Sequence, residues 1–287
     1  MRNLKGFGII ELMISILVAS IIVVGLYSLL TSSILSYGFS KATNQAVSSS
    51  HRVNMSFNTL LYQAGFMNYT RAIQNYAFPA TTTNFSDNVN WPENVVLIGG
   101  RENNQDFIKI RFAGASLQDD KRSQNVTLPN DKNTPNGFVF DCNGIPVPNT
   151  AILEIKITVT NNGLECQENA LENTNTATFD IDNNSIILDP FVKNLRLQYS
   201  MVNDGGVSGF LDSNNIATAQ WNLVSLVRYS FVTSQPSSQK MVRSATGLTL
   251  NMFADAGVTN NNYVIPDNDR SNVHRVQNGN IAIVNQL

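Results

Sequence analysis

Residues 7–35 read FGIIELMISILVASIIVVGLYSLLTSSIL, and this apolar stretch decides the fold of the N-terminal part of the chain. Its only charged residue is Glu11. As a helix, Leu12–Leu35 would be roughly 36 Å long, which is enough to cross a bilayer core of about 30 Å. Because Arg2 and Lys5 precede the run, the positive-inside rule predicts a cytoplasmic N-terminus and a C-terminal part on the other side of the membrane.

Two ordinary interpretations of this segment stay open. A cleaved secretory signal peptide has the same basic start, and Ser36-Tyr37-Gly38 is similar to a small-residue cleavage site. Against it, the apolar run exceeds the usual core of about 7–15 residues, and a carboxylate within it is costly. A plain single-pass anchor accounts for the length but not for Gly6-Phe7 or Glu11.

The third interpretation is a class III leader. Residues 5–12, KGFGIIEL, resemble the type IV prepilin motif. The resemblance implies that a prepilin peptidase cleaves between Gly6 and Phe7 and that the new first residue, Phe7, is N-methylated. Glu11 would become buried in a filament core and would need a partner there, for which the amine of Phe7 is a candidate. We therefore expect Glu11 to be an assembly contact.

The composition restricts the class of partner. The chain has 287 residues, of which 43% are hydrophobic and 14% are charged, and its net charge is −2. Loss of Arg2 and Lys5 with the leader takes this charge from −2 to −4. An acidic chain of this kind does not predict nucleic-acid binding. About 250 residues follow the membrane segment, which is enough for one large domain or two small ones.

The two cysteines, Cys142 and Cys166, predict a disulfide if their domain lies in an oxidising compartment. A closed loop of about 25 residues would stabilise the fold by roughly 3.5 kcal/mol in the chain-entropy model. We expect no metal site and no cofactor, because two distant thiols and the histidines His51 and His274 do not form a ligand cluster.

The helical pattern continues beyond the membrane segment, and Gly65 is a plausible stop signal. We expect one helix from about residue 7 to about residue 64, loosened near Gly38, whose second half lays an apolar stripe against a folded domain. The apolar residues at helical spacing are Ala46, Val53, Phe57, Leu60, Leu61 and Ala64.

After Phe66 the pattern changes to short β-type runs between loops rich in Asn, Thr, Ser and Gly. The predicted fold class is therefore α+β, with a long N-terminal helix packed on a β-rich C-terminal domain. Strands are predicted at Val95–Gly99, Phe107–Phe112, Phe138–Asp141, Leu153–Val159, Ser185–Leu188, Val192–Met201, Asn222–Thr233 and Ile281–Val284. Surface loops are predicted at the Asn-rich stretches 130–136, 173–175 and 260–262.

Several local patterns occur in a fixed order along the chain. They are Arg52-x-x-Met55, Leu60-Leu61-x-x-Ala64-Gly65-Phe66, Asp141-Cys142-x-Gly144, Leu164-x-Cys166, Val192-x-x-Leu195-x-x-Gln198-Tyr199, Trp221 with Val224 and Val227-Arg228, and Asp269-x-x-x-x-His274-Arg275 before Ile281–Asn285. In this order they resemble the PilW-type minor pilins of type IV pili. The chain departs from pilin patterns in two ways: it has no proline before Pro79, and its closing basic run is diluted by His274.

The resemblance implies a structural subunit, present in few copies, that helps to prime a type IV pilus and lies at or near its tip. The implied organisation is a leader (1–6), a transmembrane and assembly helix (7–38), its amphipathic half (39–66) and a periplasmic β-rich domain (67–287). The implied partners are other minor pilins, the major pilin, the prepilin peptidase, the inner-membrane assembly platform and a large tip adhesin.

Three other functions stay open from the sequence. A large minor pseudopilin of a type II secretion system would share the leader and the long helix. A pilus-tip binding module would read surfaces through the Asn-rich loops. A membrane-anchored enzyme is disfavoured, because Gly206-Val207-Ser208-Gly209 falls short of a nucleophile elbow. Asp180-x-Asp182-x-Asn184 begins like a calcium loop but lacks the required Gly and Glu, so an ordinary turn is predicted there.

Overall fold

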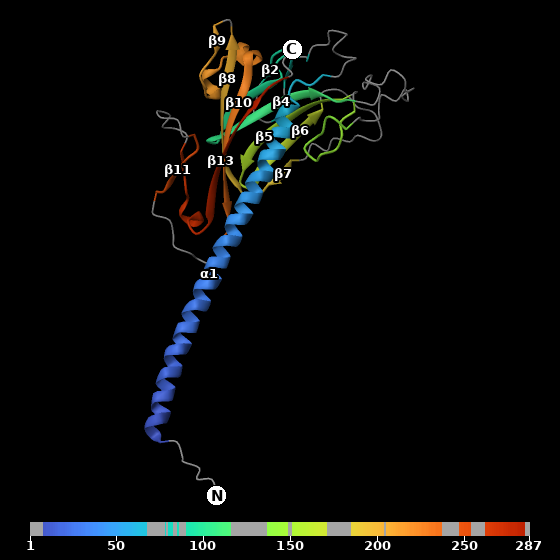
Figure 1. Cartoon of the computed structure of the whole chain (residues 1–287). Helices are drawn as coiled ribbons and strands as arrows, with labels where there is room; N and C mark the ends of the chain where they lie inside the picture. Colours follow the sequence, from blue (N-terminus) through green and yellow to red (C-terminus); the bar gives the residue numbers. More distant parts are fainter. Residues whose placement is uncertain are drawn as a thin grey trace.

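The computed structural model describes residues 8–67, 78, 80–82, 85, 90–115, 137–148, 151–170, 185–203, 205–236, 247–253 and 262–284 (Figure 1). Several sequence predictions lie outside these residues. They concern Gly6 and Phe7, the loops 130–136 and 173–175, and the calcium-like segment at 180–184.

One continuous helix, α1 (Ile9–Tyr62), carries the N-terminal part of the chain. Its 54 residues make it about 81 Å long. The expected loosening near Gly38 is wrong, because Gly38 lies within the unbroken helix and is buried. Gly65 follows the helix end in a left-handed conformation, with φ of 74°. Glycine adopts this conformation without strain, so its place just past the helix fits a stop signal.

The C-terminal domain contains a five-stranded antiparallel sheet with the order β3-β4-β5-β6-β7. Strands that are neighbours in space are also neighbours in sequence, and short turns join β3 to β4 and β5 to β6. The strands are β3 (Leu97–Glu102), β4 (Gln105–Ala113), β5 (Ile152–Thr160), β6 (Gly163–Ala170) and β7 (Ile186–Asp189).

A second antiparallel sheet has the order β13-β10-β8-β9. Its long strands are β8 (Val192–Asn203), β10 (Val224–Gln235) and β13 (Val273–Ala282), and β9 (Gly206–Val207) is a short edge. Two small strand pairs are β1 (Thr81–Thr82) with β2 (Asn90–Trp91), and β11 (Thr249–Asn251) with β12 (Asn262–Val264). Short 3₁₀ helices are η2 (Ser213–Asn215), η3 (Thr218–Leu223) and η4 (Asp267–Asp269).

The hydrophobic core lies where the two sheets and the helix meet. Strand β8 packs against β4, β5 and β6, while α1 contacts β13, β10 and β7 (Figure 1). Phe57 and Leu61 of α1 are fully buried among strand residues such as Ile110 and Phe231. The helix thus packs against strands of both sheets, and its C-terminal half belongs to the domain core. The predicted α+β class is confirmed.

Two predicted strand positions need correction. Phe138–Asp141 is not a strand, since Phe140 makes only an isolated bridge with Pro146. The carboxylate of Asp141 accepts N–H bonds from Asn143 (2.8 Å) and Ile145 (2.7 Å), which folds this segment into a turn. The last strand, β13, begins at Val273 and not near Ile281.

Candidate functional site

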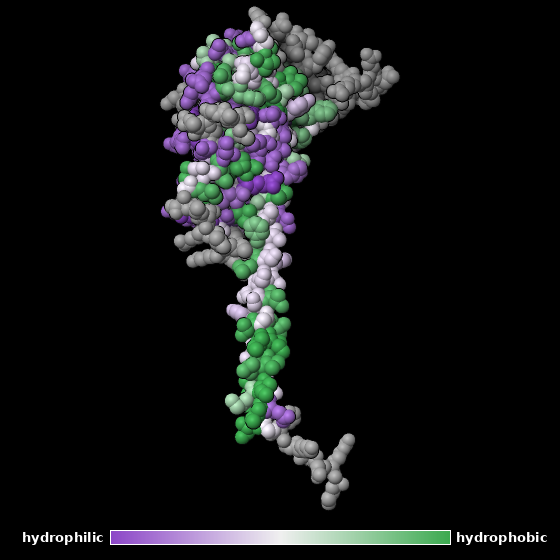
Figure 2. All heavy atoms as spheres, turned by 60° about the vertical axis from the view of Figure 1, so that its left-hand side comes forward, coloured by the Kyte–Doolittle hydropathy of each residue, from purple (hydrophilic) through white to green (hydrophobic). Residues whose placement is uncertain are grey.

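The N-terminal half of α1 stands apart from the domain and exposes apolar side chains on all sides (Figures 1 and 2). In the described part of the chain, α1 is the one helix long and apolar enough to cross a membrane, and none of its most apolar window is buried. Ile9, Val24 and Leu29 are each more than two-thirds exposed. A surface of this size is not stable in water, so a membrane or other helices must cover it.

Glu11 lies in the first turn of this apolar helix, and its carboxylate points back to the chain preceding the helix. Its Oε2 atom accepts a hydrogen bond from the backbone N–H of Gly8 at 3.2 Å. This contact satisfies one of the backbone donors left free at a helix N-terminus. Gly8 directly follows Phe7 in the sequence.

The C-terminal half of α1 is fastened to the domain by polar contacts as well as by apolar packing. Asp189 of β7 accepts hydrogen bonds from Ser49 (2.8 Å) and Arg52 (2.6 Å) through the same oxygen. The hydroxyl of Tyr229 on β10 bonds to the side-chain oxygens of Asn58 (2.8 Å) and Asn54. Each sheet therefore has its own side-chain connection to the helix.

The end of α1 is held by the segment that carries the disulfide. The amide of Gln63 donates to the carbonyl of Phe140 (3.2 Å) and accepts the N–H of the same residue (2.5 Å). A disulfide joins Cys142 to Cys166 of β6, with 6.0 Å between the Cα atoms. The helix end, the turn around residue 142 and the five-stranded sheet thus form one connected unit.

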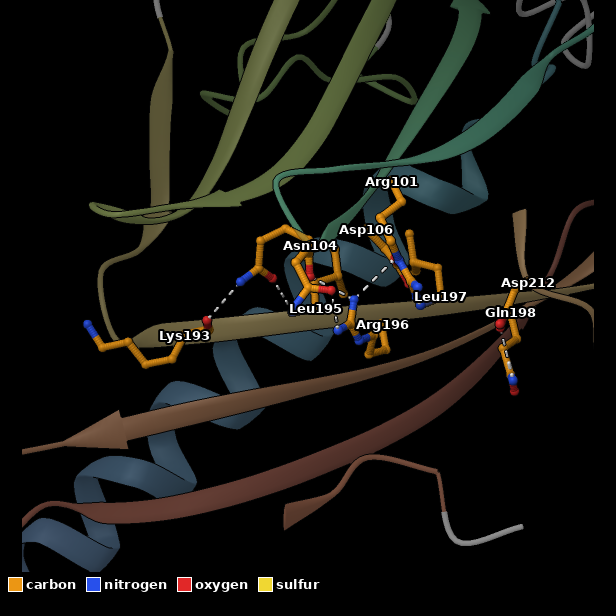
Figure 3. A network of polar contacts seen from close by, with 10 residues as sticks. Arg101, Asn104, Asp106, Lys193, Leu195, Arg196, Leu197, Gln198 and Asp212 are labelled. Carbon is orange, nitrogen blue, oxygen red and sulfur yellow. Dashed lines mark hydrogen bonds and ion pairs between the residues drawn. The ribbon is translucent and has the colours of Figure 1, made fainter. Parts of the chain in front are cut away.

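Asp106 fastens the two sheets to one another (Figure 3). Its carboxylate lies 2.7 Å from Arg101 Nε and 3.5 Å from Arg196 Nη1, and it accepts the backbone N–H of Leu197 at 2.8 Å. Asp106 belongs to β4, whereas Arg196 and Leu197 belong to β8. Both the Asp106 and the Arg196 side chains are buried, so this network stabilises the contact between the sheets.

The two histidines take separate structural positions. His51 lies on the exposed face of α1. His274 is nearly buried on β13, and its Nε2 atom lies 2.8 Å from Asp269 Oδ2. Among the residues that the structure describes, no three His, Cys, Asp or Glu side chains come together in a way that could hold a metal ion.

Residues 1–27 match the prokaryotic N-terminal methylation motif. This is a prepilin-type N-terminus. The matched motif includes Gly6, Phe7 and Glu11, and the exposed apolar helix continues directly from it. The prepilin-type motif and the single apolar helix together support a membrane-anchored, type IV pilin-like subunit.

One similar solved structure is a type IV-like pilin from Thermus thermophilus. It is 11% identical, with a TM-score of 0.41, and the alignment covers 82% of this chain and 97% of that chain. No curated protein matches the sequence.

Some surface features of the site could not be read from the sequence. Met55 and Tyr62 of α1 are each about 60% exposed, and Phe138 is exposed to a similar extent. A cavity of about 440 Å³ lies between Tyr62, Phe138 and Ile281. Tyr62, Phe138 and Ile281 lie far apart in the sequence, so no local pattern indicates that the fold brings them together.

Proposed function

We propose that this protein is a minor pilin of a type IV pilus that helps to prime filament assembly and lies at or near the tip. The observation that carries the proposal is an N-terminal helix whose first half is apolar on every side and contacts nothing in its own domain. Such a helix can leave the membrane only for an environment of similar polarity, and a bundle of like helices provides one.

The domain supports placement at an end of the filament. Two sheets and their loops form a broad head on the helix (Figure 1). A broad head hinders dense packing of subunits along a shaft, whereas a terminal subunit has a free side. We infer that the domain lies in the periplasm before assembly, where its Cys142–Cys166 disulfide would be stable.

Glu11 is proposed to guide docking by pairing with an N-methylated Phe7 amine, on its own chain or on a neighbour. We expect Glu11→Ala to leave membrane insertion intact, since the change removes a charge from an apolar helix. Incorporation into pili should fall at least tenfold, measured by mass spectrometry of sheared pili. The matched control is Ser15→Ala, one turn further along the same helix. Normal incorporation of the Glu11→Ala protein would refute the role.

The same preparation tests the wider proposal. The proposed subunit should be recovered in low abundance from intact pili, with an N-methylated terminus at Phe7. Deletion of the gene should reduce piliation without loss of type II secretion. Loss of secretion with normal piliation would assign the chain to the pseudopilins, and a mature terminus near Phe39 would show a secretory signal peptide.

A further inference from the structure

A polar groove of about 790 Å³ opens on the domain. It lies between the β3–β4 turn, the β5–β6 turn, the start of β8 and the segment from Tyr263 to Asp269. Its volume falls within the range of about 300–1,000 Å³ that small-molecule sites occupy. The groove plays no part in the helix-mediated assembly proposed above.

Amides and hydroxyls make up most of the groove wall. Asn103, Thr158, Asn161, Gln167 and Asn268 all line it. Most ligand pockets are mainly apolar with a few polar groups, and this lining reverses that proportion. Such a wall offers many hydrogen-bond donors and acceptors at short spacing, which suits a ligand that carries many hydroxyl groups.

The turn that presents Asn161 is held by hydrogen bonds within the domain. Thr160 Oγ1 donates a hydrogen bond to Glu165 Oε1 (2.5 Å) and accepts one from the backbone N–H of Asn162 (3.1 Å). The Asn162 side chain also donates to Glu165 Oε1 at 3.2 Å. A wall fixed in this way loses little conformational entropy on binding.

The charged groups of the groove are largely engaged with one another. Glu102 lies 3.2 Å from Lys156 Nζ, and Asp269 is bound by His274 and Ser234 at 2.8 Å each. Lys193 projects from β8 away from the Asp106 network (Figure 3) and, among the described residues, forms no ion pair. The described lining of the groove therefore holds no cluster of cations that would bind a phosphate. The Lys193 ammonium remains to bond a hydroxyl group or a single carboxylate of a ligand.

Tyr263 supplies an aromatic ring to this polar wall. It is partly exposed, and burial together with the charge of Asp269 raises the pKa of Tyr263 to about 12. The phenol therefore stays protonated at neutral pH and keeps its O–H donor. A partly exposed ring beside amides offers an apolar face to the C–H side of a sugar ring and a polar edge to its hydroxyls.

We propose that this groove binds an oligosaccharide. Tyr263 packs against one sugar ring, and Asn161, Asn268 and Lys193 bond to its hydroxyl or carboxylate groups. The shared chemistry is a chain of sugar rings, which a cell-surface glycan and the glycan strands of peptidoglycan both provide. The inference does not depend on the proposed role in a pilus.

The test uses the full chain, labelled and held in detergent micelles. The probes are an array of neutral, sialylated and uronate-containing oligosaccharides and a separate set of peptidoglycan glycan fragments. Binding should occur in one of the two sets, which identifies the source. Asn161→Trp and Asn268→Trp place a large side chain in the groove from exposed positions. Each should weaken binding about tenfold or more, which corresponds to about 1.4 kcal/mol.

The matched control is Asn222→Trp, at an exposed position of η3 that does not line the groove. This variant should bind as the unaltered protein does, and thermal unfolding should show that all three variants are folded. Absence of binding in both probe sets would overturn the proposal, as would unchanged binding by both groove-filling variants. Incorporation into pili is measured separately. It tests the proposed pilin function alone, so a failure of glycan binding can be told apart from a failure of that function.

Discussion

Asp106 is the residue on which the polar contact between the two sheets depends. It is nearly buried and pairs with Arg101 and Arg196, and Leu197 donates to it from the other sheet. We expect Asp106→Ala to lower the free energy of unfolding by about 3–5 kcal/mol, because it leaves a buried guanidinium without its carboxylate. Denaturant unfolding of the full chain in micelles measures this loss.

Glu102→Gln is the control for that change. Glu102 also belongs to an ion pair, with Lys156, but its side chain is 45% exposed. A partly exposed pair contributes little, so the loss should stay below about 1 kcal/mol. Equal losses in the two variants would show that the Asp106 network has no special role.

Glu168 gives the domain a pH-dependent stability. Burial raises the pKa of Glu168 from 4.5 to about 7, although the N–H of Cys142 donates to its carboxylate and opposes this shift. Between pH 4.5 and about pH 7, the folded state therefore binds more protons at Glu168 than the unfolded state does. The stability from this group is therefore complete below pH 4.5 and is lost as the pH rises through about 7.

Glu168→Gln should remove this part of the pH dependence. The variant keeps an oxygen that accepts the Cys142 N–H, so its thermal midpoint should fall less than that of the unaltered protein as the pH rises from about 4 to about 8. Parallel curves for the two proteins would contradict the prediction.

Glu165 lies on the same strand, and its contribution to stability should depend on pH in the opposite direction. Burial raises its pKa, but hydrogen bonds from Thr160, Ser185 and Asn162 together hold the pKa below its ordinary value. Its stabilisation is present above the ordinary pKa and is lost as the pH falls. Glu165→Gln should therefore lower the midpoint at neutral pH, with a difference that shrinks in acid.

At the scale of elements, the packing of α1 on the second sheet depends on a glycine. An added Cβ at Gly279 of β13 would lie 2.3 Å from the ring and hydroxyl of Tyr229, which bonds to Asn58 of the helix. We expect Gly279→Ala to displace this tyrosine and to cost about 1–3 kcal/mol. Gly209→Ala, at a position with open space, should change stability by less than about 0.5 kcal/mol in the same unfolding assay.

Strands with apolar alternation could be predicted from the sequence, and strands without it could not. Leu153–Val159 alternates cleanly and lies within β5. Strand β6 shows no such alternation, because Glu165, Gln167 and Asn169 alternate with a face that itself contains Glu168. Buried hydrogen bonds from the folded domain, such as that from Asn169 to Glu154 at 3.2 Å, satisfy these polar groups. No local pattern reveals a partner that lies 15 residues away.

The whole molecule divides at the point where the helix enters the domain. The buried residues of α1 begin at Gly38, and the residues from Ile9 to Leu30 are exposed. A chain that begins at Ser36 should therefore fold, because it keeps the entire buried face of the helix. We expect it to be soluble without detergent and monomeric by size-exclusion chromatography, with unchanged β-sheet circular dichroism. Aggregation of this shortened chain would show that the domain needs the apolar half.

The same division explains which parts of the site the sequence could reveal. The apolar helix and Glu11 lie in one short stretch, so composition and spacing indicate them directly. The groove cannot be found this way, since Asn103, Asn161, Lys193 and Asn268 come from four segments that only the fold brings together. Tyr263 and Asn268 also carry no distinguishing pattern in the sequence.

The unbroken helix has a mechanical consequence. A pull on its N-terminal end runs along a rod of about 81 Å and loads the domain in shear. The shear acts along the part of α1 from Gly38 to Leu61, where the buried residues of the helix lie. Ser49, Arg52 and Gln63 are then loaded in parallel, so no single contact carries the whole force. At the far end, the Cys142–Cys166 crosslink passes the load into the five-stranded sheet through covalent bonds. The molecule is thus built to bear tension along its helix axis.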